Sequence, residues 1–106
     1  MIKLKDGTVV DGIIEEAKFE MSNTGHWHLG GFAKGHNSIP DGHLMTTSRV
    51  LNLLPCDVDE GNSFILAVTK HSTYALDTHT LHASIAEVER VLIDLMGEEI
   101  CGDTMN

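Results

Sequence analysis

Short apolar runs broken by turn residues characterise the first three quarters of the chain and are typical of β-strands. Residues 2–5 and 8–14 flank Asp6-Gly7, a dipeptide that favours the tight turn of a hairpin. Residues 64–69 and 73–76 form a second hairpin pattern, because an apolar, partly β-branched run resumes after a polar interruption. We therefore expect antiparallel strands at both places.

Between these hairpins the pattern is less regular. Residues 15–24 fit either one turn of helix or a continuation of the preceding strand. Residues 27–33 predict a bent strand with a bulge, since the paired glycines Gly30 and Gly31 would weaken a helix by about 1 kcal/mol each. Gly12, inside the second strand, indicates another bulge or a close approach of the backbone.

The middle of the chain contains a strong turn signal. Residues 39–42 read Ile-Pro-Asp-Gly, in which proline presets φ and glycine accepts a left-handed conformation. Residues 43–54 then predict one strand that ends at Pro55. The acidic residues 57–62 predict a solvent-exposed loop.

Near the C-terminus the apolar period changes to three and four residues, as in an α-helix. Ser84 and Glu87 form a capping box, and Gly97 predicts the end of the helix. The helix either packs on the chain's own sheet or forms a seam between two copies, and both are compatible, because Val91 and Met96 widen the apolar arc. The residues of the apolar stripe are Leu81, Ile85, Val88, Leu92 and Leu95.

These elements predict the α+β class, with a small, mainly antiparallel β-sheet or open barrel and one C-terminal α-helix. Residues 1–106 are expected to form a single domain, because two domains would each lie near the lower size limit for burying a core. Hydrophobic residues at 42% and charged residues at 22% agree with a globular protein and exclude a disordered tail or a collagen-like repeat.

The distribution of charge restricts the partners. Seven Lys and Arg against 16 Asp and Glu give a formal net charge of −9, which disfavours binding to duplex DNA. Residues 87–103 contain six acids and only Arg90 as a base, whereas Asp41 is the only acid in residues 21–54. A surface that accepts an anion is therefore expected in residues 21–54.

The apolar runs and the cysteines indicate the compartment in which the protein is located. No apolar run approaches the roughly 20 residues that cross a bilayer, so no membrane association is expected. Cys56 and Cys101 lie far apart and no apolar N-terminal segment is present, which indicates a reducing compartment. We expect a cytoplasmic protein.

Seven histidines suggest a metal site as one alternative. His26 and His28 would share one face of a strand and bind Zn or Fe if a third ligand arrived from elsewhere. Cupin-type sites carry a carboxylate a few residues after such a pair, but residues 29–32 contain none. We therefore predict no metal and no cofactor, and interpret these histidines as polar or hydrogen-bonding groups.

A second alternative is catalysis by a pair of histidines. Residues 71–74 (HSTY) and 82–85 (HASI) look like the paired motifs of 2H phosphoesterases, in which two histidines act as acid and base. In that family the motifs lie on separate halves of a larger fold, whereas here they are eleven residues apart and Ser84 is already used as the helix cap. The prediction is that the protein is not an enzyme.

Donor-rich segments occur at residues 35–43 (GHNSIPDGH), 46–50 (TTSRV) and 69–76 (TKHSTYAL). Over roughly residues 30–77 the sequence resembles small phage and prophage proteins with a Gly-His-x-x-[Ile/Phe]-Pro-Asp-Gly turn and a Thr-Ser-x-Val strand. Within that class it is similar to the Thoeris anti-defence sponges, which oligomerise and sequester nucleotide signals such as cyclic ADP-ribose isomers. The resemblance implies a non-enzymatic anti-defence protein that sequesters a small anionic nucleotide.

The expected ligand site lies between residues 34–49 and the hairpin of residues 69–76. Lysine and arginine there would meet phosphate, and an aromatic ring would stack on the base. The alternative is purely structural, with residues 40–42 as a turn, 46–48 as the polar face of a strand and Tyr74 as core. The candidate ligand-binding residues are Trp27, Phe32, Lys34, His36, His43, Thr47, Ser48, Arg49, Lys70, His71 and Tyr74.

Two kinds of protein partner are also expected. The nucleotide-binding hypothesis includes a homo-oligomer formed through the helix of residues 84–96. The alternative function is an acidic, anti-CRISPR-like inhibitor that binds a host defence protein and mimics nucleic acid. The acids of the C-terminal helix and of residues 57–60 would supply the negative charge.

Overall fold

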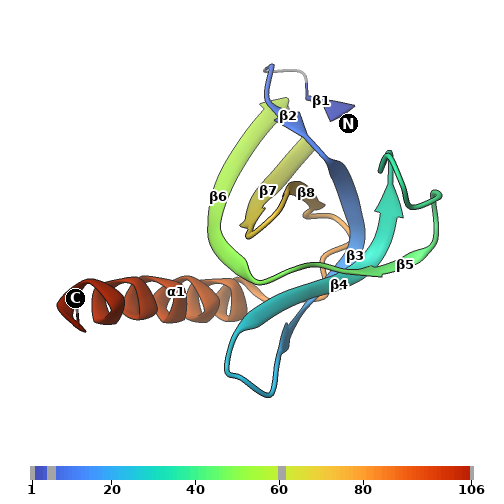
Figure 1. The fold of residues 1–106 in the computed structure, drawn as a ribbon. Helices are drawn as coiled ribbons and strands as arrows, with labels where there is room; N and C mark the ends of the chain where they lie inside the picture. Colours follow the sequence, from blue (N-terminus) through green and yellow to red (C-terminus); the bar gives the residue numbers. More distant parts are fainter. Residues whose placement is uncertain (1, 5–6, 60–61, 106) are drawn as a thin grey trace.

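The structure is a computed structural model that describes residues 2–4, 7–59 and 62–105, with side chains described except at residues 56–59, 62–63 and 98–105. It confirms the α+β class with one C-terminal helix (Figure 1). The described part of the chain contains no helix with the length and apolar character of a membrane span. The elements are β1 (Ile2–Lys3), β2 (Val9–Val10), β3 (Gly12–Met21), β4 (Trp27–Lys34), β5 (Leu44–Thr46), β6 (Val50–Asp59), β7 (Asn62–Thr69), β8 (Thr73–Asp77) and α1 (Ile85–Met105).

Six strands form one strongly curved sheet in the order β5-β4-β3-β8-β7-β6 (Figure 1). Neighbouring strands are antiparallel except β3 and β8, which are parallel. In the described residues the ladder ends at β5 on one side and at β6 on the other, so the sheet is open. The expected hairpin of residues 64–76 is confirmed as β7 and β8.

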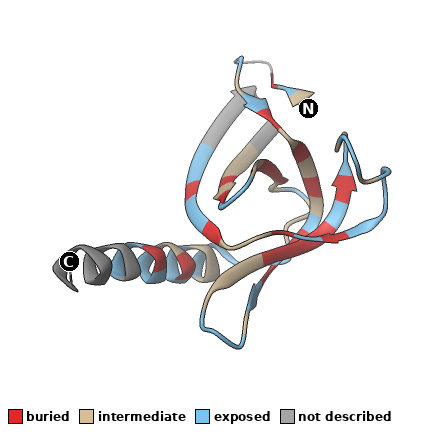
Figure 2. Cartoon of the chain, in the orientation of Figure 1, coloured by how far each residue is buried: buried red, intermediate tan, exposed pale blue. Residues whose placement is uncertain are grey.

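The main core lies between one face of this sheet and the first turns of α1 (Figure 2). Fully burying a large apolar side chain stabilises a fold by about 1.5–3 kcal/mol. The buried members are Ile14, Ala17, Phe19, Leu29, Ala33, Met45, Val50, Leu53, Ala67, Tyr74, Leu76, Val91 and Leu95.

A smaller core lies under the N-terminal hairpin. Leu4 and Val10 pack there against Ala75, whose strand neighbours Tyr74 and Leu76 belong to the main core. Because successive strand residues point to opposite faces, the hairpin covers the other side of the sheet. The predicted continuous strand over residues 8–14 is wrong, since Asp11 separates β2 from β3.

Residues 15–21 continue as strand, which resolves the ambiguity between helix and strand. Residues 27–33 form β4 as expected, but the register shift lies in its partner β3, between Glu15 and Lys18. A Cβ on Gly31 would lie 2.8 Å from the Glu15 carbonyl oxygen and would also overlap the Ile14 side chain. Gly31 is therefore the residue that lets β4 approach the bulge.

The single strand predicted over residues 43–54 is wrong, because the chain forms β5 and β6 at opposite edges of the sheet. The side chain of Thr47 ends β5: its hydroxyl accepts the Leu29 N–H at 3.0 Å and donates to the Ser48 carbonyl at 2.8 Å. These bonds anchor Thr47 beside β4 while the chain turns away toward β7.

Strand β6 also continues beyond its predicted end. It passes through Pro55 to Asp59, which is possible because β6 is an edge strand and proline there loses no ladder hydrogen bond. The loop predicted over residues 57–62 is wrong at residues 57–59, which belong to β6, and at Asn62, where β7 begins, whereas residues 60–61 lie outside the described residues.

The start of α1 is confirmed and its predicted end is wrong. The Glu87 N–H donates to the Ser84 hydroxyl at 3.1 Å, as in the expected cap. The helix continues through Gly97 to Met105, and its C-terminal half extends beyond the sheet (Figure 1). Ile85 does not belong to the buried stripe, because 80% of it is exposed, and Val91 is fully buried instead.

Candidate functional site

A cleft of about 680 Å³ opens on the outer surface of the sheet at the bulge of β3. A second hollow of about 380 Å³ shares Glu16, Phe32 and His82 with it, so the two form one groove, called here the bulge cleft. These volumes lie within the usual range for small-ligand sites, roughly 300–1,000 Å³. The lining residues are Glu15, Glu16, Lys18, Gly31, Phe32, Gly42, Leu44, His79, Thr80, Leu81 and His82.

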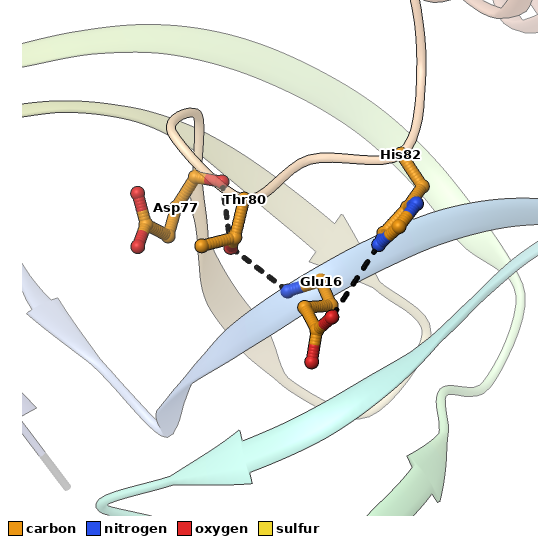
Figure 3. Close-up of polar contacts among 4 residues, drawn as sticks. All are labelled: Glu16, Asp77, Thr80 and His82. Atoms are coloured by element: carbon orange, nitrogen blue, oxygen red, sulfur yellow. Dashed lines mark hydrogen bonds and ion pairs between the residues drawn. The ribbon is translucent and has the colours of Figure 1, made fainter.

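The backbone of Glu16 gives the bulge cleft its shape. Glu16 has a φ of 52°, which is unfavourable for a residue with a side chain and needs fixed partners. Its N–H donates to the Thr80 hydroxyl at 2.8 Å (Figure 3), and the His82 N–H donates to the Ala17 carbonyl at 2.8 Å. These two bonds hold residues 80–82 beside β3 as one wall of the cleft.

Asp77 fixes the same wall from its other end. Its carboxylate accepts the His79 N–H at 2.9 Å, and its carbonyl accepts the Thr80 N–H at 3.3 Å. The Thr80 hydroxyl donates to that carbonyl at 3.5 Å while it accepts from Glu16 (Figure 3). Thr80 is therefore engaged as both donor and acceptor and acts as a positioning residue.

The opposite wall is a row of side chains across three strands. Phe32 on β4 lies directly opposite Glu15 on β3 and Leu44 on β5. Directly opposed residues project from the same face with Cβ atoms about 4.5–5.5 Å apart. Phe32 is 37% exposed and Leu44 is 72% exposed, so their apolar surfaces form an accessible platform beside the Glu15 carboxylate.

Charged groups surround this platform without strong mutual pairing. The Glu16 carboxylate lies 3.6 Å from His82 Nε2, with 54% and 61% of the two side chains exposed. Lys18 Nζ lies 3.3 Å from the Glu20 carboxylate, also near the surface. Exposed pairs of this kind contribute little to stability, so these groups are able to exchange their partners for a ligand.

Three predicted residues lie at or near the bulge cleft. Phe32 lines both of its parts, and Lys34 shares the face of Phe32 because it is two residues further along β4. His43 is exposed beside Gly42, which lines the cleft, and its carbonyl accepts the Ala33 N–H at 3.0 Å. Phe32 is the predicted residue with the most direct place in the site.

His36 and Tyr74 form a separate contact. Their rings are stacked with centroids 6.0 Å apart, and the Tyr74 hydroxyl lies 3.5 Å from His36 Nε2. His36 Nδ1 accepts the backbone N–H groups of Ser38 at 3.0 Å and of Ile39 at 3.2 Å. Tyr74 is only 6% exposed, so the structural interpretation fits this pair better than ligand stacking.

The other predicted residues are distributed over the rest of the sheet. Trp27 packs edge-on against Phe19 at 6.3 Å and donates from Nε1 to the Asp94 carboxylate at 3.1 Å, which docks α1. The Lys70 N–H donates to the Arg49 carbonyl at 3.0 Å, so these two residues are neighbours. The remaining predicted residues are buried Thr47, half-buried Ser48 beside it, and exposed His71 beside Lys70.

The structure does not assemble either of the two histidine sites considered as alternatives, the catalytic pair or the metal site. His71 and His82 flank β8, whose five residues alone span about 17 Å, too far for one phosphodiester. His28 Nδ1 lies 3.0 Å from the Thr47 carbonyl, and so is engaged as a donor. Among the described residues, no three His, Cys, Asp or Glu side chains converge as metal ligands.

Sequence reasoning missed most of the bulge cleft. Glu15, Glu16 and Lys18 lie in the stretch with no clear pattern, and residues 79–82 are assigned only to the histidine motif at His82 and to the apolar stripe at Leu81. The available signal was Gly30-Gly31, which indicated a bulge but not the strand that carries it.

Comparisons with known proteins give no match: no protein family matches the chain, and no curated protein or solved structure matches it significantly.

Proposed function

We propose that the protein binds a small nucleotide in the bulge cleft and sequesters it without transforming it. The observation that carries the proposal is the position of Phe32, a half-exposed ring that lines both parts of the cleft. A nucleobase stacked on such a ring gains about 1–3 kcal/mol. The cleft is large enough for a base and its sugar.

Two lysines and the histidines support binding of the phosphate. Lys18 lines the cleft, and Lys34 lies on the same face about 7 Å along β4 from Phe32. Lysines bind phosphate as point charges, and His79 and His82 add further hydrogen-bond donors. The cations therefore lie around the aromatic platform, although Arg49 and Lys70 are elsewhere.

The biological role that we propose is that of a phage-type anti-defence protein in the cytoplasm of a bacterial host. Sequestration needs binding without chemistry, and the engaged Thr80 hydroxyl of the cleft supports that role. The resemblance over residues 30–77 supports the anti-defence setting. The exposed residues Ile93 and Met96 of α1 support assembly into a homo-oligomer through residues 84–96.

Isothermal titration of nucleoside monophosphates and cyclic ADP-ribose into the protein tests this proposal. Phe32→Ala is expected to weaken binding roughly tenfold or more, because stacking is lost. Met21→Ala, a truncation of another exposed apolar residue outside the cleft, should leave affinity unchanged. Chromatography should recover the nucleotide intact. No heat with any nucleotide, or equal affinity of Phe32→Ala and wild type, would contradict the proposal.

The second candidate function is an acidic inhibitor of a host defence protein. It is favoured by α1, where Ile85, Ile93 and Met96 are exposed on a helix whose segment 87–103 contains six acids. Replacing Glu98 and Glu99 by lysine is then expected to abolish capture of a host protein in a pull-down. Capture unaffected by this reversal would count against the inhibitor.

A further inference from the structure

We infer that the base bound in the bulge cleft is a purine of the guanine type, and that the Glu15 carboxylate recognises it by hydrogen bonds to its edge. This inference rests on the proposed function and adds the class of base. It starts from the register of β3 and β4, in which Glu15 and Phe32 are direct partners. A base stacked on Phe32 therefore turns one edge toward Glu15.

The Glu15 carboxylate is available for such a contact. Glu15 is half-buried, and within the described part of the chain no side-chain hydrogen bond or ion pair engages its carboxylate. Its neighbour Glu16, by contrast, faces His82 at 3.6 Å. Partial burial limits competition by water, so hydrogen bonds from a ligand to Glu15 count for more than at an open surface.

An ionised carboxylate accepts hydrogen bonds and donates none. The guanine edge offers two adjacent donors, N1–H and the 2-amino group, which match the two carboxylate oxygens. Adenine and cytosine each offer one amino donor beside a ring nitrogen that is an acceptor, and a carboxylate repels that nitrogen. Uracil offers one N–H between two carbonyls. Guanine alone among these bases makes two parallel hydrogen bonds to Glu15.

The charged side chains of the cleft determine the orientation of the bound nucleotide. Glu15 and Glu16 repel a phosphate, so the base lies toward these acids and the phosphate lies away from them. Lys18 lies beyond the bulge opposite Gly30, and Lys34 lies on the other side of Phe32 along β4. The sugar extends from the base stacked on Phe32, and either lysine is close enough to bind the phosphate that the sugar carries.

The test is calorimetric titration of GMP and AMP into the full chain, because the two ligands differ only in the base. Wild type is expected to bind GMP about tenfold to a hundredfold more tightly than AMP, the discrimination of a bidentate contact. Glu15→Gln is expected to lose this preference, because an amide has one donor and one acceptor and pairs equally with adenine or with N1–H and O6 of guanine. Glu89→Gln, an exposed change on α1, should retain the preference for GMP.

The outcomes separate this inference from the proposed function. If neither these nucleotides nor cyclic ADP-ribose binds wild type, the proposed function fails and this inference fails with it. If cyclic ADP-ribose binds and GMP does not, nucleotide binding stands and the guanine assignment is overturned. If GMP and AMP bind equally, or AMP binds more tightly, nucleotide binding stands and the guanine assignment is overturned. If folded Glu15→Gln prefers GMP as strongly as wild type does, Glu15 is not the residue that recognises the base and the inference is overturned.

A second ligand pair protects the test against loss of fold in the variant. Inosine monophosphate lacks the 2-amino group of GMP and keeps N1–H, so it offers Glu15 one donor instead of two. Wild type should bind inosine monophosphate roughly tenfold more weakly than GMP. Equal affinity for the two would overturn the assignment without any substitution.

Discussion

Glu16 adopts a backbone conformation that favours glycine. The hydrogen bond from its own N–H to Thr80, and the bond from the His82 N–H to the carbonyl of the next residue, Ala17, hold it there. The left-handed region costs an L-residue roughly 1–2 kcal/mol. Strain of this kind persists where the surrounding structure requires it, often beside a functional site. In this protein the positive φ directs the Glu16 N–H toward the Thr80 hydroxyl, and the resulting hydrogen bond holds one wall of the bulge cleft in place.

This strain predicts a difference between two substitutions at Glu16. Both Glu16→Gly and Glu16→Ala remove the carboxylate and its contact with His82, but only glycine relieves the positive φ. Glu16→Gly is therefore expected to be more stable than Glu16→Ala by about 1 kcal/mol in urea unfolding. Equal midpoints would show that the bulge is not strained in solution.

A second pair of substitutions tests the close approach at Gly31. A Cβ at Gly31 would meet the Glu15 carbonyl and Ile14, whereas a Cβ at Gly97 in α1 would meet nothing within 4 Å. Gly31→Ala should destabilise the protein by about 1–3 kcal/mol. Gly97→Ala should stabilise it by about 0.5–1 kcal/mol, because α1 runs through this residue. Chemical denaturation of both variants decides, and a neutral Gly31→Ala would refute the packing at the bulge.

At the scale of the elements, sequence patterns were reliable where a local interaction determines the structure. The second hairpin and the Ser84 cap depend on residues close together in the chain and are present as predicted. The break at Thr47 and the passage of β6 through Pro55 depend on distant partners or on a place at the sheet edge. Such features leave no local pattern, so one strand was predicted where there are two.

Truncating a buried and an exposed apolar side chain of α1 should affect the free energy of unfolding by very different amounts. Leu95 is packed in the main core, whereas Ile93 is 68% exposed. Leu95→Ala should lower the free energy of unfolding by about 2–5 kcal/mol, the usual range for a buried leucine. Ile93→Ala should change it by less than about 0.5 kcal/mol in the isolated protomer. Thermal unfolding at low protein concentration gives the comparison, and similar losses for both would contradict the docking of α1.

At the scale of the whole molecule, the bulge cleft joins segments more than 60 residues apart in sequence, as the bond between Glu16 and Thr80 illustrates. The parallel pairing of β3 with β8 creates this neighbourhood, and no periodicity in the sequence encodes it. Sequence reasoning could therefore identify Phe32 as a candidate aromatic residue. It could not identify Glu15 as the residue opposite Phe32, because that depends on the register of β3 and β4.

Native mass spectrometry of the protein purified gently from bacterial cells is a direct test of nucleotide binding in the bulge cleft. One spectrum reports both the number of subunits and any retained small molecule. We expect an oligomer that carries an adduct of nucleotide mass, which Phe32→Ala loses while the subunit number stays the same. A wild-type spectrum without any adduct, even after nucleotides are added, would contradict nucleotide binding in the bulge cleft.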